Sequence, residues 1–230
     1  MSLILNIETA TPICSVCLAQ DGRVIGYREN SDGNSHARLL TVMIEELLSA
    51  NSISLNQLDA VAVSSGPGSY TGLRIGVSVA KGLCYSLNIP LISVPTLGSM
   101  AEGLKQKSNS SLSYYLSIMD SKRMDAFIAI FDVVGNEVVS TKLVTIDNDF
   151  EKEISVFGQL IFGGSGRAVE KFRTMFNSDR FIYVGDSGFG SQYMTNISEQ
   201  KWRAKKFEDV AYFQPFYFGE FEPVKKKEKQ

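Results

Sequence analysis

SSGPGSYTGLRIG, at residues 64–76, joins a short apolar β-type run to an apolar helix-like run. The glycines on either side of Pro67 reach backbone angles closed to other residues, and the proline fixes one φ between them. Ser69 or Thr71 is placed to cap the helix that follows, and the N–H groups of a helix start suit an anion. The spacing alone leaves two interpretations open, a phosphate-binding loop and a tight strand-to-helix turn.

Neither standard nucleotide-binding loop fits this stretch. The Walker pattern needs Gly-Lys-Ser/Thr after its first glycine, and no lysine lies between Gly66 and Gly76. The Rossmann pattern would place its third glycine at Thr71, whereas the glycine falls at Gly72. The small residues of this loop therefore serve either close packing or anion binding, and both interpretations stay open.

The composition indicates a globular protein with a substantial core and no bias toward nucleic acid. Of its 230 residues, 44% are hydrophobic and 21% are charged, which suits one large or two small domains. The formal net charge of −2 lacks the basic excess of a free-standing nucleic-acid binder. No apolar run is long enough for a membrane span and no signal peptide is visible, so we expect a cytoplasmic protein without a membrane partner.

The cysteine and histidine content argues against a metal or nucleophilic centre. Three cysteines are an odd number for a disulfide framework. Cys14 and Cys17 have the spacing of a metal clip, but in an alternating strand they face opposite sides, and no second pair follows. His36 is the single histidine, and no Gly-x-Ser-x-Gly elbow supports a triad built on it. We therefore expect no catalytic and no metal-binding residue.

Hydrophobic patterning predicts two copies of the order β-β-β-α-β-α. The first copy is predicted to have strands at 3–9, 14–19, 23–29, 60–64 and 91–94, and helices at 35–50 and 71–87. The second is predicted to have strands at 114–119, 124–131, 137–145, 159–162 and 181–184, and helices at 149–154, 167–176 and 187–204. The polar stretch 105–113 marks the seam, so we expect an N-terminal lobe at 1–107 and a C-terminal lobe at 108–230.

The helix predicted after the glycine loop is apolar on nearly all sides. Gly72, Gly76 and Ala80 lie four apart and form one smooth stripe along it. Each interior glycine costs about 1 kcal/mol relative to alanine, so close approach of another element is the expected compensation. We expect one face of this helix to lie on the sheet and another to contact a protein, together with the helix at 35–50.

Four stretches of the chain resemble one protein family. They are ILNIETAT at residues 4–11, SHARLL at 35–40, SGPGSYTGLRIG at 65–76 and VPTL at 94–97. These residues are similar to the TsaB (YeaZ) family of bacterial tRNA threonylcarbamoyladenosine biosynthesis proteins, in the glycoprotease-like branch of the actin, hexokinase and Hsp70-like superfamily. The resemblance covers roughly residues 1–100. It implies an α/β protein with a two-lobed actin-like ATPase (ribonuclease H-like) fold and a duplicated βββαβα unit.

The resemblance implies a non-catalytic scaffold subunit, needed for threonylcarbamoylation of adenosine 37 in tRNAs that read codons beginning with A. The catalytic relative TsaD holds a metal with two histidines on one helix, and His36 alone cannot rebuild that site. Members of the family bind and activate a TsaD-like catalytic subunit, a TsaE-like ATPase joins the pair, and tRNA is reached through the complex. A homodimer is the alternative when the partner is absent.

In the family, the two first-lobe helices form the contact with the TsaD-like subunit. In this chain these are the helices predicted at 35–50 and 71–87. The residues expected at this interface are Leu40, Met43, Leu47, Gly72, Arg74, Gly76, Val79 and Leu83.

Glu8, Asp120, Gly163 and Gly164 are candidates for a nucleotide site between the lobes. The two acids end the opening strand of each half, where sugar kinases of the superfamily place a general base or magnesium ligand; leftover strand-end acids are the alternative. The glycine pair follows a predicted strand, as does the pair that borders the adenosine in the superfamily. Because the hairpin turns lack a glycine for a phosphate, we expect no cofactor of the chain itself, with ATP or ADP shared at a complex interface as the alternative.

Two other functions stay open. One is an ATP-dependent small-molecule kinase or ATPase of the same superfamily, which would use the cleft acids. The other is a glycoprotease-like peptidase, suggested only by the old name of the family, since the chain has neither a histidine pair nor a nucleophile elbow.

The C-terminal region has a basic and an aromatic feature. The basic residues either contact tRNA phosphates or form a solvated face; they are Lys201, Arg203, Lys205 and Lys206 around Trp202, and the lysine-rich tail at 225–229. Aromatic residues are too dense between 212 and 221 for a free tail. We expect that segment to dock on the fold or on a partner.

Overall fold

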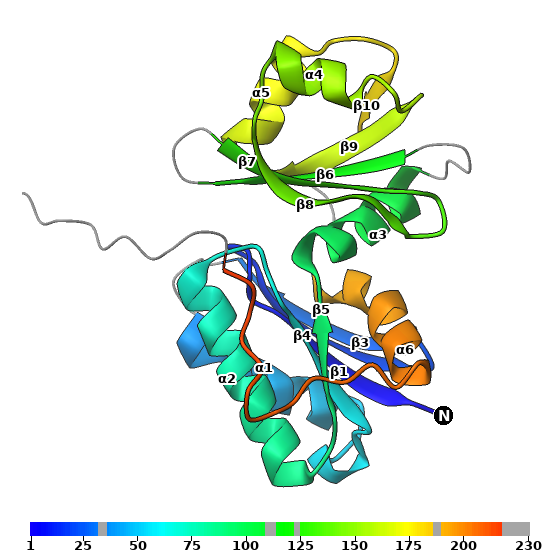
Figure 1. The fold of residues 1–230 in the computed structure, drawn as a ribbon. Coiled ribbons are helices and arrows are strands. Elements are labelled where there is room, and N and C mark those ends of the chain that lie inside the picture. The colour runs from blue at the N-terminus through cyan, green and yellow to red at the C-terminus, as the bar shows by residue number, and fades with distance from the viewer. Residues whose placement is uncertain (32–35, 109–113, 122–124, 186–189, 218–230) are drawn as a thin grey trace, which may run out of the picture.

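The computed structural model describes residues 1–31, 36–108, 114–121, 125–185 and 190–217. It consists of two lobes, each built around a five-stranded sheet (Figure 1). Among the described residues, no helix combines the length and the hydrophobicity needed to cross a bilayer.

The first sheet has the strand order β3-β2-β1-β4-β5. Its strands are β1 (Leu3–Glu8), β2 (Cys14–Gln20), β3 (Arg23–Asn30), β4 (Ala60–Ser64) and β5 (Leu91–Val94). The central strand β1 pairs antiparallel with β2 and parallel with β4. Helices α1 (His36–Ala50) and α2 (Tyr70–Leu87) pack on one face of this sheet, around a core of aliphatic side chains.

The second sheet repeats this topology, in the order β8-β7-β6-β9-β10. Its strands are β6 (Tyr114–Asp120), β7 (Asp125–Phe131), β8 (Glu137–Thr145), β9 (Leu160–Ser165) and β10 (Phe181–Tyr183). Helices α4 (Asn148–Ile154) and α5 (Arg167–Met175) cover one of its faces. Strand for strand the two sheets correspond, so the predicted duplication is confirmed.

Each half continues into a further helix that packs on the sheet of the other half. Helix α3 (Thr96–Ser108) follows β5 and contacts β6, β7 and β9 of the second sheet. Helix α6 (Thr195–Arg203) follows the short 3-10 helix η3 (Ser191–Met194) and contacts β1 and β5 of the first sheet. This exchange of helices joins the lobes.

Helix α3 corrects the sequence interpretation, which placed no helix there and began the polar seam within it. All residues from Thr96 to Leu104 are buried, because the helix lies between the two sheets. A helix surrounded by protein has no polar face, and small residues on all sides hide the helical period. The Ser117 hydroxyl donates a hydrogen bond to the Leu97 carbonyl at 2.8 Å and fixes the helix on β6.

The lobe boundary at residues 107 and 108 stays a prediction. The described part of the chain after Gly190 lies against the first sheet: Met194 and Ile197 join a cluster with residues of β1, β4 and β5. A short 3-10 helix, η1 (Leu55–Gln57), lies between α1 and β4.

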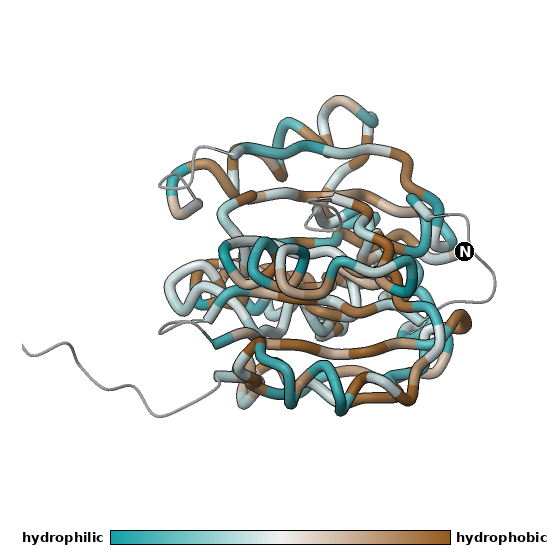
Figure 2. Tube along the Cα trace, turned by 90° about the horizontal axis from the view of Figure 1, so that it is seen from above, coloured by the Kyte–Doolittle hydropathy of each residue, from teal (hydrophilic) through white to brown (hydrophobic). Residues whose placement is uncertain are grey.

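Hydrophobic side chains form one core on the helix-covered face of each sheet and a third cluster between the lobes around α3. Figure 2 shows hydrophilic and hydrophobic residues alternating along the outer helices, as expected where one helix face packs on a sheet. In the second lobe the core includes a cluster of phenylalanines, and the Phe172 ring lies 4.7 Å from Phe162 and 5.1 Å from Phe181, centroid to centroid.

Replacing Phe172 with alanine is expected to lower the free energy of unfolding by about 3–5 kcal/mol, because the side chain is fully buried and its loss leaves a cavity. Urea unfolding followed by circular dichroism measures the change. Met175 on the same helix is 43% exposed, so Met175→Ala is the control, and its free energy of unfolding should fall much less. Equal losses would contradict the packing described for α5.

Candidate functional site

The glycine loop uses its polar groups within the chain. The Ser65 amide donates to the Val94 carbonyl at 2.9 Å, and the Ser69 amide donates to the Ala10 carbonyl at 2.7 Å. The Ser69 hydroxyl accepts a hydrogen bond from the Gly72 amide at 3.2 Å and caps α2, as the sequence predicts for this residue. These contacts favour the tight-turn interpretation over the phosphate-binding loop.

The glycine stripe of α2 packs on the turn between β1 and β2. A Cβ on Gly72 would overlap the Thr9 carbonyl oxygen, and a Cβ on Gly76 would overlap the Thr9 hydroxyl. A Cβ on Gly68 would lie 2.5 Å from the Ala10 carbonyl oxygen. The close approach that compensates for these glycines is therefore intramolecular.

The structure divides the predicted interface residues into two groups. Five lie inside the chain, where they support the helices rather than offer surface: Leu40, Met43, Leu47, Gly72 and Gly76. Three reach the surface: Arg74 is exposed, and Val79 and Leu83 are half-buried. The leucines and Met43 belong to the core because α1 presents this apolar side to the first sheet.

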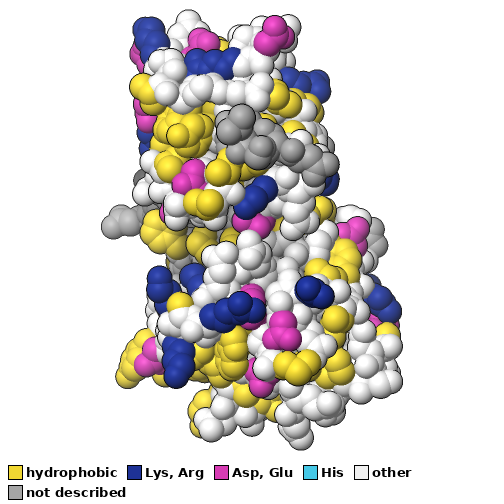
Figure 3. All heavy atoms as spheres, turned by 90° about the vertical axis from the view of Figure 1, so that its right-hand side faces the viewer, with side chains coloured by type: hydrophobic (Ala, Val, Ile, Leu, Met, Phe, Trp, Pro, Cys, Tyr) yellow, Lys and Arg dark blue, Asp and Glu magenta, His cyan; other side chains and the backbone are white. Residues whose placement is uncertain are grey.

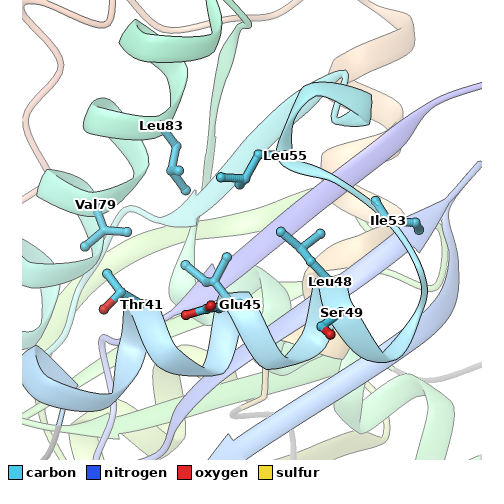
Figure 4. Close-up of a pocket in the computed structure, with 9 residues that line it drawn as sticks. Thr41, Glu45, Leu48, Ser49, Ile53, Leu55, Val79 and Leu83 are labelled. Carbon is cyan, nitrogen blue, oxygen red and sulfur yellow. The ribbon is translucent and has the colours of Figure 1, made fainter.

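An apolar groove of about 480 Å³ separates α1 from α2 on the surface (Figure 4). Its hydrophobic lining comes from both helices and from the connection between α1 and β4: Ile44, Leu48, Ile53, Leu55, Val79 and Leu83. Thr41, Glu45 and Ser49 supply polar groups along α1. The groove is therefore bounded by two helices and has the dimensions and chemistry to receive apolar side chains of a protein.

Next to the groove, one side of α2 faces away from the protein and is exposed; we call it the exposed arc. It carries Thr71, Arg74, Ser78, Gly82 and Tyr85. A Cβ added to Gly82 meets nothing within 4 Å, so this interior glycine has no packing reason within the described residues. Small residues at Ser78 and Gly82 allow the backbone of another helix to approach closely. Arg74 forms no salt bridge with a described residue, and its guanidinium lies 4.1 Å from the Tyr70 ring centroid.

Glu8, at the end of β1, is buried. Its Oε1 accepts a hydrogen bond from the Ala10 amide at 2.5 Å, and its Oε2 has no hydrogen-bond partner among the described residues. Burial raises the pKa of the Glu8 carboxyl to about 7, against the opposing effect of the Ala10 hydrogen bond. The residue is therefore an enclosed acid of the first lobe and not a strand-end acid in a wet cleft.

Asp120, at the equivalent end of β6, holds the start of α5. Its two carboxylate oxygens accept hydrogen bonds from the Arg167 amide at 2.9 Å and the Ala168 amide at 2.6 Å. Gly163 and Gly164 lie within β9, paired with β6, and not in a loop after the strand. A side chain on Gly164 would overlap the Ile118 carbonyl, so strand packing accounts for this glycine. The Asp120 carboxylate occupies the helix start at which an anion would bind.

The remaining candidate residues form no reactive cluster in the described parts of the chain. Cys14, Cys17 and Cys84 are buried free thiols, and no group of three His, Cys, Asp or Glu side chains there is arranged for a metal. His36 begins α1, and its side chain lies outside the described residues.

The basic residues of α6 are partly engaged within the fold. Lys201 donates to the Ser93 carbonyl at 2.8 Å, and Arg203 pairs with Glu199 at 2.7 Å. Lys205 and Lys206 are exposed. Figure 3, which faces the α6 side, shows positive and negative side chains interspersed, and the tail at 225–229 lies outside the described residues. The solvated-face interpretation fits this arrangement.

The duplicated sheets with exchanged helices define a two-lobed protein of the actin-like class. A family model described as "TsaD: tRNA N6-adenosine threonylcarbamoyltransferase" matches residues 30–212, and the chain belongs to this family.

Several relatives found by sequence comparison carry the name TsaB. The tRNA threonylcarbamoyladenosine biosynthesis protein TsaB of Escherichia coli (strain K12) is 39% identical over 108 residues, 47% of this chain and 46% of that protein. TsaB of Haemophilus influenzae is 30% identical over 156 residues, 68% of this chain and 58% of that protein. The chain thus spans about half the length of the curated relatives it matches.

Solved structures show the same fold over almost the whole chain. YeaZ from Pseudomonas aeruginosa matches with a TM-score of 0.78 at 20% identity and covers 95% of this chain and 100% of that one. An inorganic polyphosphate/ATP-glucomannokinase from Arthrobacter matches with a TM-score of 0.54 at 12% identity and covers 89% and 100%. The predicted actin-like fold and the resemblance to TsaB (YeaZ) are confirmed.

The two interior glycines of α2 are expected to respond oppositely to alanine. Gly76→Ala should destabilise the fold, because the new Cβ overlaps Thr9. Gly82→Ala should stabilise it by up to about 1 kcal/mol, because the space is open and alanine favours the helix. Urea midpoints of the two variants measure the difference, and a Gly76→Ala protein as stable as Gly82→Ala would contradict the packing of α2 on the turn.

The raised pKa of Glu8 predicts that the wild-type fold loses stability between pH 4.5 and pH 7. In that window the unfolded carboxyl is ionised while the buried one holds its proton, so the native state binds more protons and stability falls as pH rises. Across this window the free energy of unfolding falls by about 3 kcal/mol because of Glu8, and Glu8 causes no further change above pH 7.

Glu8→Gln should remove this decline. Urea midpoints of both proteins across the same pH range measure the effect, with Glu46→Gln, on the exposed side of α1, as the charge-removal control. Parallel curves for wild type and Glu8→Gln would show that Glu8 is ionised in the fold.

Proposed function

We propose that this chain is a non-catalytic subunit for threonylcarbamoylation of adenosine 37 in tRNA, and that it binds and activates a TsaD-like catalytic subunit. The groove between α1 and α2 and the open glycine beside it carry this proposal. Family membership and the names of the TsaB relatives support the assignment to this pathway.

The surface of the helix pair suits a helical partner. Leu48, Val79 and Leu83 offer apolar contact within the groove, and Gly82 and Ser78 let a second helix lie close to α2. Glycine in an exposed helix position costs stability. Close approach of a partner helix would explain why a destabilising glycine stands at this position, because no neighbour among the described residues requires it.

The surroundings of Glu8 and Asp120 support the non-catalytic part of the proposal. A kinase or ATPase needs an acid free to bind magnesium or take a proton, whereas Asp120 caps α5 and Glu8 is enclosed. With a single histidine, the chain lacks the histidine pair that the resemblance associates with the catalytic relative. We include in the proposal a cytoplasmic location, a TsaE-like ATPase that joins the pair, and access to tRNA through the complex. ATP or ADP would be held at the interface of that complex, and a homodimer would form in the absence of the partner.

Gly82→Leu is expected to weaken binding to the TsaD-type protein of the same organism at least tenfold, which is about 1.4 kcal/mol. The added side chain projects into open space, so the fold should be kept while the approach of a partner helix is blocked. Leu83→Glu, which places a charge in the groove, should do the same. Isothermal titration calorimetry measures affinity, and circular dichroism verifies folding.

Val156→Leu is the matched control, since Val156 is 81% exposed in the second lobe. If Gly82→Leu and Leu83→Glu bind the TsaD-type protein as tightly as wild type does, the helix pair is not the interface. If wild type does not bind that protein at all, the proposed function is wrong.

A further inference from the structure

After α6 the chain runs back across the first lobe in a segment without regular secondary structure, from Asp209 to Tyr217, which we call the strap. Figure 1 shows it passing along α2 toward the glycine loop. Just before the strap, the Glu208 amide donates to the Leu91 carbonyl at 2.9 Å and anchors the chain at the edge of the first sheet. At its other end, the Phe216 amide donates to the Ser65 carbonyl at 2.8 Å.

Lys81 of α2 holds the middle of the strap. Its ammonium donates to the carbonyls of Ala211 at 2.9 Å and Phe213 at 3.2 Å. Phe213 packs on the first-lobe core, and the Asp209 carboxylate accepts hydrogen bonds from the Ala211 and Tyr212 amides at 2.8 and 3.1 Å. The expected docking of the aromatic segment on the fold is therefore seen as far as Tyr217.

Docking leaves aromatic side chains outward along α2. Tyr212 is 83% exposed and is flanked by the two residues whose carbonyls Lys81 binds. Tyr85 lies one helical turn beyond Lys81 and is 84% exposed. At the other end, the rings of Tyr70 and Tyr217 lie 5.0 Å apart, with the Arg74 guanidinium over Tyr70.

This composition is that of a binding surface. Tyrosine and arginine are enriched among the residues that contribute most to binding at protein interfaces. Tyrosine in particular buries much area at a low cost in side-chain entropy. Most large apolar side chains of the described residues are covered, whereas these two tyrosines are held almost fully exposed on a pinned backbone. Fold stability does not account for a strap that packs Phe213, half-buried, on the core but keeps Tyr212 outside.

We propose that the strap, clamped by Lys81, completes the partner-binding surface of α2, and that Tyr85, Tyr212 and Arg74 form a second strip beside the α1–α2 groove. The occupant is the same protein partner, through a segment that carries apolar side chains and a carboxylate. Helix α2 has two basic residues and no acidic one, and Arg74 has no carboxylate among the described residues, so the strip favours an acidic contact. This inference rests on the proposed function.

Calorimetry with the purified TsaD-type protein tests the strip on the full-length chain. Tyr212→Ala and Tyr85→Ala should each weaken binding about tenfold, because both remove an exposed ring without touching the core. Val134→Ala, at a residue 67% exposed in the second lobe, is the control and should leave the affinity unchanged.

Lys81→Met tests whether Lys81 acts by positioning the strap, as distinct from the direct contact of Tyr212 with the partner. It should increase hydrogen exchange at the Phe216 amide and weaken binding about tenfold, since the strap is no longer held. In that background Tyr212→Ala should weaken binding less than threefold further, because a released Tyr212 no longer contributes. Full additivity of the two changes would show that Lys81 does not position Tyr212.

The outcomes distinguish this inference from the proposed function. If both tyrosine variants bind within threefold of wild type while Gly82→Leu loses binding, the strip is not part of the interface and the helix-pair interface stands. If the tyrosine variants change only the self-association of the chain, measured by light scattering, the strip is a homodimer surface and the inference is overturned. If wild type does not bind the TsaD-type protein, both proposals are wrong.

Discussion

The close approach of α2 to the turn between β1 and β2 is the constraint on which the proposed partner surface depends. Gly68, Gly72 and Gly76 have no side chains, so the turn residues Thr9 and Ala10 lie directly on the loop and the helix. The Ser69 amide and hydroxyl then fix the first turn of α2. With one side of α2 pressed onto the turn, its opposite side faces outward, beside α1. The groove, the exposed arc and the track of the strap all follow from that orientation.

The layout of the fold could be predicted from the sequence where the hydrophobic pattern has a solvent side. Alternation and turn residues located the ten strands of the described residues within a few positions, and the repeat of their order predicted the two-lobed architecture. Helix α3 was not predicted, because a helix buried on all sides has no alternation of polar and apolar faces. At the site, the small-residue stripe of α2 was visible, but spacing cannot distinguish a turn of the same chain from a helix of another. The structure assigns Gly72 and Gly76 to the first role, whereas the space around Gly82 is open among the described residues.

The two halves show how a duplicated fold changes the use of equivalent residues. Glu8 and Asp120 both end the first strand of a half, and both were sequence candidates for a nucleotide site. Burial keeps a proton on Glu8 up to about pH 7. Asp120 instead accepts hydrogen bonds from the first amides of α5. Asp120 is therefore satisfied by the chain itself, whereas Glu8 is enclosed by it at a cost in stability that grows as pH rises.

The strap links the second half of the chain to the exposed surface of α2. It follows α6, the helix of the second half that packs on the first sheet, and it ends at the glycine loop. The outer side of α2 is therefore bounded by segments from opposite ends of the chain, α1 on one side and the strap on the other. A surface assembled in this way forms only when both halves are folded and α6 is in place. Recognition by a partner would then report on the integrity of the whole two-lobed protein, although the contacts lie on the first lobe.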